Sequence, residues 1–167
     1  MIIDSHCHLT YEPMSNALNE TIDRANKDGI KYMLTISTVD KSFEQILKIV
    51  NSYESVYGTY GIHPHEAKSH QHIKSDDIIN KVNKNKKIIG IGETGLDFYY
   101  NHSEKKDQIY SFEEHISAAQ KKNLPLIVHT RSAEKETLQI LEKHSKKKKL
   151  KYLFIVLPDH VNSLLNY

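Results

Sequence analysis

Short apolar runs rich in β-branched residues alternate with longer segments of helical periodicity along most of this chain. The apolar runs predict strands over residues 2–5, 30–37, 56–62, 88–92, 126–129 and 152–157. The segments between them predict helices over residues 43–50, 78–82, 104–122 and from 132 to between 144 and 149, because their apolar residues recur at helical spacing. Strands that alternate with helices are typical of βα units around a parallel sheet.

Chain length limits how such units can be arranged. The chain has 167 residues, whereas a complete (β/α)₈ barrel usually needs about 250. No long linker or break in composition divides it, so we expect one domain of class α/β. Five to six βα units fit an incomplete TIM-type barrel, and an open doubly wound sheet is the alternative.

Composition narrows the class of protein further. No stretch approaches the roughly 20 apolar residues of a membrane-spanning helix, and an acid and a histidine follow the first three residues before any leader-like segment develops. Cys7 is the single cysteine, so no intrachain disulfide can form. These features predict a cytoplasmic protein without membrane partners. The near balance of 23 basic against 21 acidic residues excludes nucleic-acid binding by net charge alone.

Histidines are unusually frequent, with 11 in the chain, and two of them flank Cys7 at the end of the first strand. The two-residue period of a strand points His6 and His8 to one side and Cys7 to the other. Two imidazoles on one side of a strand end form a chelate for a metal ion, although two incidental histidines would give the same pattern. Cys7 is predicted to pack against its neighbours.

Two further strand ends carry residues that bind metals. Glu93 follows the run 88–92 in a predicted loop over residues 92–97, and His129 ends the run 126–129. The carboxyl ends of barrel strands converge on one mouth, so these side chains should meet His6 and His8 there. A carboxylate can bridge two ions roughly 3.5 to 4 Å apart, and Glu93 is the predicted bridge. The alternatives are a turn glutamate and a histidine bonded to a neighbouring loop.

A third group of residues suits substrate binding. His63 and His65 flank Pro64 at another strand end, where the proline is expected to hold the chain extended and rigid. Arg131 follows His129 and could hold a phosphate through paired donors. Solvent-facing imidazoles and a surface salt bridge are the respective alternatives.

Four segments together, residues 3–9, 61–65, 91–97 and 127–131, resemble the TatD family of metal-dependent deoxyribonucleases. The match runs in order from residue 1 to about 149. It implies a TIM-type barrel that hydrolyses DNA, typically as a 3′ to 5′ exonuclease, with two divalent cations such as Mg, Mn or Zn. By this resemblance His6 and His8 hold the first ion, Glu93 bridges as the catalytic carboxylate, His129 holds the second ion, and His63 touches the substrate phosphate.

The carboxyl-terminal part departs from the family pattern. The family continues with a metal-binding histidine in a motif like Ile-His-Cys-Phe-Thr-Gly on the sixth strand and an aspartate near the eighth. Residues 153–160 read Leu-Phe-Ile-Val-Leu-Pro-Asp-His, and His160 follows a proline instead of standing on a strand. We therefore divide the chain into a partial barrel over residues 1–149 and a divergent tail over residues 150–167.

A change of reading frame would account for that tail. A set of codons can be chosen that encodes residues 153–162. When the same nucleotides are read from the third one onward, they encode Ile-His-Cys-Phe-Thr-Gly-Ser-Cys-Glu. A frameshift near residues 149–152 is the resulting hypothesis. An incomplete barrel would expose unpaired strands and apolar faces, so we expect poor solubility or assembly with a separate carboxyl-terminal fragment.

Three functions therefore stay open at the level of sequence. The first is a DNA-cleaving TatD-type hydrolase with a retained part of its site. The second is an inactive truncated fragment that keeps a partial metal site, and the third is a metal-dependent amidase or lactonase on a related barrel.

Overall fold

The computed structural model describes residues 1–100, 102–146 and 148–155. The elements of this described part are β1 (Ile2–Cys7), η1 (Met14–Ala17), α1 (Leu18–Lys27), β2 (Ile30–Thr35), η2 (Asp40–Ser42), α2 (Phe43–Ser52), β3 (Val56–Tyr60), η3 (Pro64–His70), α3 (Ser75–Val82), β4 (Ile88–Asp97), α4 (Lys105–Lys122), β5 (Leu126–Arg131), α5 (Glu134–Ser145) and β6 (Tyr152–Ile155), where η marks 3₁₀ helices.

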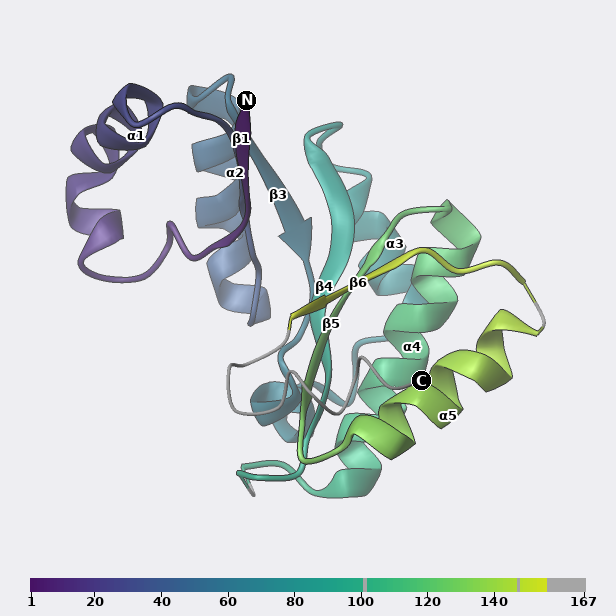
Figure 1. Cartoon of the computed structure of the whole chain (residues 1–167). Coiled ribbons are helices and arrows are strands. Elements are labelled where there is room, and N and C mark those ends of the chain that lie inside the picture. Colours follow the sequence, from purple (N-terminus) through teal and green to yellow (C-terminus); the bar gives the residue numbers. More distant parts are fainter. Residues whose placement is uncertain (101, 147, 156–167) are drawn as a thin grey trace.

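The strands form one sheet whose order follows the sequence from β1 to β6 (Figure 1). Every neighbouring pair is parallel. A doubly wound sheet reverses its strand order at a switch point, whereas a barrel adds each strand beside the last one. The incomplete TIM-type barrel predicted from the sequence is therefore confirmed, and the doubly wound alternative is excluded.

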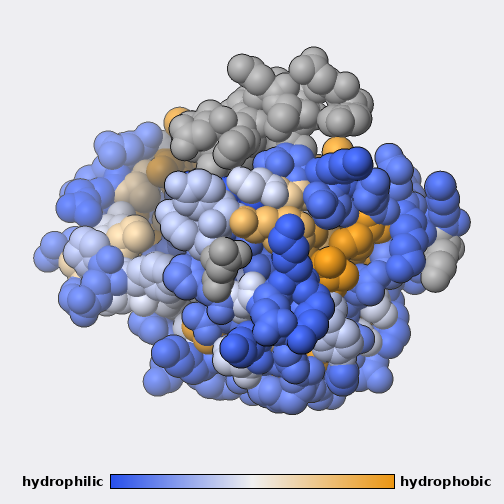
Figure 2. Space-filling view, turned by 90° about the horizontal axis from the view of Figure 1, so that it is seen from below, coloured by the Kyte–Doolittle hydropathy of each residue, from blue (hydrophilic) through white to orange (hydrophobic). Residues whose placement is uncertain are grey.

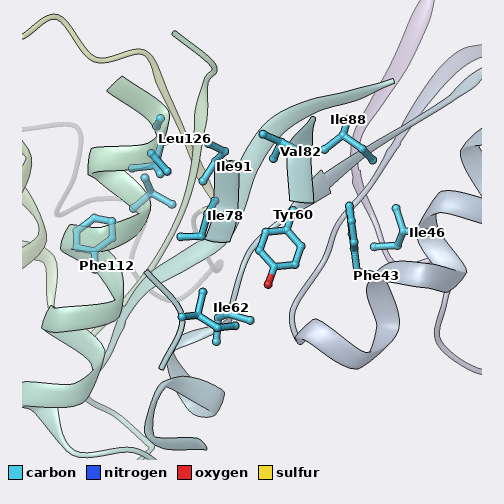
Figure 3. Close-up of a cluster of buried hydrophobic side chains, with 14 of the residues drawn as sticks. Phe43, Ile46, Tyr60, Ile62, Ile78, Val82, Ile88, Ile91, Phe112 and Leu126 are labelled. Atoms are coloured by element: carbon cyan, nitrogen blue, oxygen red, sulfur yellow. The ribbon is translucent and has the colours of Figure 1, made fainter. Parts of the chain in front are cut away.

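Apolar side chains of α2, α3 and α4 cover one face of the sheet. Phe43 and Ile46 of α2, Ile78 of α3 and Phe112 of α4 are fully buried there (Figure 3). They pack against strand residues that share this face, namely Val56, Ile88, Ile91, Leu126 and Val128. Burying each large apolar side chain contributes about 1.5–3 kcal/mol, so this layer is the main source of stability in the described part.

The opposite face of the sheet is open at the amino-terminal strands. Side chains alternate along each strand, so the neighbours of the helix-facing residues point to this second face. A hollow of about 290 Å³ lies there, lined by Ile3, Tyr32, Leu34, Tyr57 and Ile89 among others. Ile3, Tyr32 and Ile89 are 54%, 42% and 39% exposed. An apolar face is thus accessible to solvent, as expected of an incomplete barrel.

Strand β4 differs most from its prediction. The residues assigned to a loop, 92–97, continue the strand to Asp97 and pair with β5 through Thr94↔Val128, Gly95↔His129 and Asp97↔Arg131. Gly92 and Gly95 adopt φ of 134° and 138°. A Cβ at either position would overlap a carbonyl oxygen of β5, so these glycines permit close strand pairing and do not form a turn.

Three smaller predictions also need correction. Strands β2 and β3 end two residues earlier than expected, helix α1 was not predicted, and Pro64 begins the 3₁₀ helix η3 instead of an extended segment. Residues 156 and 157 of the predicted last strand, His160 and most of the divergent tail lie outside the described residues. None of the helices in the described ranges is both long and apolar enough to span a membrane.

Candidate metal centre

The carboxyl ends of β1, β4 and β5 and the segment after β3 surround one pocket of about 490 Å³. The strands run toward the end of the molecule shown in Figure 2, which is largely hydrophilic. The sequence predicted that these strand ends converge, and the structure brings six of the seven predicted site residues to the pocket: His6, His8, His63, His65, Glu93 and His129.

His6 and His8 face each other at the end of β1. Their Nε2 atoms lie 3.1 Å apart, and their rings meet edge to face. Cys7 between them turns away and directs its thiol to the carbonyl of Leu34 at 3.4 Å. Burial raises the pKa of the Cys7 thiol to about 12, so it stays protonated and packs against the core, as the strand period predicts.

Glu93 stands between two groups of histidines and is 4% exposed. Its Oε2 lies 3.6 Å from His6 Nε2. Its Oε1 lies 3.0 Å from His129 Nδ1 and 4.0 Å from His63 Nε2. Each carboxylate oxygen therefore faces a different group of imidazoles, which is the arrangement that a bridging carboxylate needs.

Hydrogen bonds oppose the effect of burial on the pKa values of Glu93 and His129. Burial alone would raise the pKa of Glu93, but the hydrogen bond with His129 and the nearby His63 and His6 hold it below its ordinary value. Burial likewise acts to lower the pKa of His129, and its bonds to Glu93 and Asp97 outweigh this and raise it. The site thus keeps Glu93 as a carboxylate, the form that binds cations.

His63 is oriented by its own loop. Its Nδ1 accepts a hydrogen bond from the backbone N–H of His65 at 3.2 Å. Burial, together with the neighbouring histidines, lowers the pKa of His63 to about 3, so the ring is neutral. A neutral imidazole that accepts at Nδ1 carries its proton on Nε2, the atom that faces Glu93. His63 can therefore donate a hydrogen bond into the pocket.

Asp97 joins two of the histidines and was not among the predicted site residues. Its Oδ2 accepts hydrogen bonds from His65 Nε2 at 2.8 Å and from His129 Nε2 at 3.1 Å. The bond to His129 leaves Nδ1 of that ring directed at Glu93. One signal in the sequence pointed to Asp97: it lies four residues after Glu93, so it shares a face with Glu93 once β4 is extended.

Arg131 is the one predicted site residue that the structure does not bring to the pocket. It does not line the pocket, and no salt bridge to it is present in the described ranges. Its guanidinium instead lies 4.1 Å from the ring centre of Tyr99 and 4.7 Å from that of Tyr100.

The donor atoms of the pocket fit divalent cations. Two sets of ligand atoms lie within 4.8 Å of one another, His6 with His8 and Glu93, and His63 with Glu93 and His129. Two imidazole nitrogens on one ion, each bonded at about 2.1 Å, are separated by roughly 3.0–3.4 Å, and the Nε2 atoms of His6 and His8 match this spacing. Imidazole and carboxylate donors suit zinc, manganese or iron.

Comparison with known proteins identifies the family of this chain. Residues 3–156 match the family described as TatD related DNase. The chain belongs to the TatD family. It is 35% identical over 156 residues to an uncharacterized metal-dependent hydrolase of Buchnera aphidicola from Acyrthosiphon pisum, and the match covers 88% of this chain and 59% of the relative.

Two further TatD-family proteins extend the comparison. The 3′-5′ ssDNA/RNA exonuclease TatD of Salmonella typhimurium is 29% identical over 141 residues, which cover 84% of this chain and 54% of that protein. A TatD family hydrolase from Entamoeba histolytica has the same fold, with a TM-score of 0.84, 22% identity, and coverage of 99% of this chain and 62% of that one. The chain thus spans somewhat more than half the length of the relatives it matches.

Proposed function

We propose that this TatD-family chain carries part of a two-cation site that hydrolyses phosphodiester bonds of DNA from the 3′ end. The observation that carries the proposal is the placement of Glu93, whose two oxygens face separate groups of histidines. In this proposal His6 and His8 hold the first cation, His129 holds the second through Nδ1, and Glu93 binds both.

Other residues of the pocket would bind the substrate and orient the ligands. Bound divalent cations would polarise the phosphoryl group and activate a water. His63 directs its Nε2 proton into the pocket, where it can donate to a phosphate oxygen of the substrate. Asp97 holds Nε2 of His129, so Nδ1, which faces Glu93, is the atom that would bind a cation after it gives up its proton.

A phosphodiester suits this pocket better than an amide or a lactone. A neutral donor beside two cation positions matches the negative oxygens of a phosphate, and the Salmonella relative is named as a single-strand DNA and RNA exonuclease. DNA is therefore the proposed substrate class, with Mg, Mn or Zn as candidate cations. An amidase or lactonase remains an outcome of the test.

The family resemblance implies two further ligands, a histidine on the sixth strand and an aspartate near the eighth. We propose that a frameshift near residues 149–152 replaced the histidine and that a separate carboxyl-terminal fragment is needed for full activity. Sequencing the gene from codon 140 onward tests the frameshift. Another frame that encodes Ile-His-Cys-Phe-Thr-Gly would support it, and the lack of such a frame would contradict it.

The activity itself is tested with the 167-residue protein and a 5′-labelled single-stranded oligonucleotide in Mg²⁺ or Mn²⁺. We expect slow stepwise shortening from the 3′ end that is lost in His6→Ala and in Glu93→Gln. His72→Ala serves as the matched control, because His72 is exposed and lies outside the pocket.

The two alternative functions predict different results when metal binding and other substrates are measured as well. Metal binding without cleavage of any substrate, even after a fragment with the two missing ligands is added, would identify an inactive fragment. Hydrolysis of an amide or a lactone without DNA cleavage would identify the third function. Either result would overturn the proposal of a DNase.

A further inference from the structure

Two tyrosines stand exposed directly after β4, beside the candidate metal centre. Tyr99 is 57% exposed and Tyr100 is 41% exposed. Their rings meet edge to face with centres 4.8 Å apart. The guanidinium of Arg131 lies over both rings, within the 6 Å range of a cation–π contact. Contiguous exposed apolar surface often marks an interaction site.

The tyrosine pair is held in place by the same carboxylate that orients the histidines. Asp97 Oδ1 accepts hydrogen bonds from the backbone N–H groups of Tyr99 at 3.1 Å and of Tyr100 at 3.0 Å. Its Oδ2 accepts from His65 and His129. One buried side chain therefore sets the position of the tyrosines relative to the proposed second cation.

Neighbouring imidazoles connect this surface to the pocket. The ring of His102 stacks on Tyr100 with centres 5.6 Å apart and an interplanar angle of 28°. His65 lies 4.6 Å from His102 and 5.5 Å from Tyr100, and it lines the pocket. A continuous row of flat rings thus leads from the exposed tyrosines to the mouth of the site.

We propose that Tyr99 and Tyr100, with Arg131 across them, form a platform on which an unpaired nucleobase of the substrate strand stacks. This inference rests on the proposed function and specifies its substrate as a strand with accessible base faces. Aromatic rings bind bases of any sequence because every base has a π-face, and a guanidinium adds attraction to the adjacent phosphate. Duplex DNA offers no free base face except at its frayed ends.

The test compares two labelled ligands of equal charge in a direct binding assay. One is 5′-fluorescein dT₁₀, and the other is the same chain without bases, built from tetrahydrofuran abasic units. Fluorescence anisotropy is recorded with Ca²⁺ present, so that turnover does not interfere. We expect the protein to bind dT₁₀ about tenfold more tightly than the abasic chain, because stacking acts only on the first ligand.

Variants then test whether the tyrosines cause the preference for dT₁₀ over the abasic chain. Tyr99→Leu/Tyr100→Leu should bind both ligands equally, and Tyr99→Trp, which enlarges the ring, should keep or increase the preference. Tyr32→Leu is the matched control, since Tyr32 is a similarly exposed tyrosine on the open sheet face, and it should leave the preference unchanged. The tryptophan variant keeps the test decisive if the double leucine variant does not fold.

Three results would overturn the platform. These are equal binding of both ligands by the unchanged protein, a full preference in the double leucine variant, and loss of the preference in Tyr99→Trp. The hydrolysis assay is separate. Base preference without DNA cleavage would support the platform and contradict the proposed function, whereas cleavage without base preference would contradict only the platform.

Discussion

At the scale of single residues, Asp97 joins two of the pocket histidines, and it was not among the residues predicted from the sequence. Six of the pocket residues could be predicted from the sequence, because the ends of parallel strands converge. Such a prediction needs only the position of each residue along its strand. The partners of Asp97 could not be predicted in this way. His65 and His129 are separated from it by 32 positions in each direction, and only the fold brings all three together.

Replacing the shared carboxylate by an amide tests this role. In Asp97→Asn the ring of His129 loses its anionic partner, so we expect about a 10- to 100-fold weaker affinity for the second cation. Isothermal titration with Mn²⁺ measures the affinity. Asp76→Asn is the matched control, because Asp76 is an exposed aspartate that pairs with Lys121. Equal affinities in the two variants would show that Asp97 does not orient His129.

At the scale of elements, the alternation of strands and helices was predictable and the extent of β4 was not. Gly92 and Gly95 resemble turn residues in the sequence, because glycine is the usual residue of tight turns. In the structure they permit β5 to approach β4 closely, so the segment stays in the sheet and carries Glu93 and Asp97 along one face. The spacing of two paired backbones is not visible in one sequence.

Substitution of these glycines separates the two interpretations. Gly95→Ala places a Cβ against the carbonyl of His129 at φ 138°, and we expect it to lower the free energy of unfolding by about 3 kcal/mol or more. Gly29→Ala also has a positive φ, of 90°, but nothing lies within 4 Å of its added Cβ, so we expect a loss of about 1 kcal/mol. Urea unfolding of both variants measures the difference. Equal losses would contradict the close-pairing account.

Helix α4 supports the His63 loop through a buried histidine. His115 accepts the N–H of Ile62 at Nε2, at 3.1 Å, and its Nδ1 donates to the Ser111 carbonyl, at 2.7 Å. Burial lowers the pKa of His115 to about 4, from about 6.5 in the unfolded chain. The unfolded state therefore binds this proton first as the pH falls, and stability is lost between pH 6.5 and 4, by up to about 3 kcal/mol.

A non-titrating variant isolates this contribution. In His115→Gln the side chain still offers an acceptor to Ile62 but takes up no proton. Urea unfolding at pH 7.5 and pH 5 should show a smaller loss of stability on acidification in the variant than in the unchanged protein. The other histidines are present in both proteins, so their effects cancel. An equal loss in both would exclude His115 as a source of the pH dependence.

At the scale of the whole molecule, the sheet of the described part leaves one face open. The six strands cover one side of a barrel wall, and the hollow lined by Ile3, Tyr32 and Ile89 faces solvent. Parallel sheets are normally covered on both faces. The barrel class was predictable only through the resemblance to the TatD family, because the order of units and the chain length also fitted a doubly wound sheet. The residues of the hollow were not, because irregular register in β1 decides which of its side chains share this face.

Polar substitutions in the hollow should reduce self-association. We expect Tyr32→Thr/Ile89→Thr to sediment as a smaller species than the unchanged protein at the same concentration, because less apolar area is exposed. Sedimentation velocity measures this, with Lys48→Thr on the exposed side of α2 as the control. If the double variant associates as strongly as the unchanged protein, the open face is not the source of association.

We propose that Glu93 serves two cation positions, and the number of Mn²⁺ ions that the protein binds tests this proposal. Titration at neutral pH, followed by electron paramagnetic resonance, should show two ions on the unchanged protein. His6→Ala should lose the first ion and keep the second, His129→Ala should do the reverse, and Glu93→Gln should lose both. Retention of either ion at full affinity in Glu93→Gln would contradict the shared bridge.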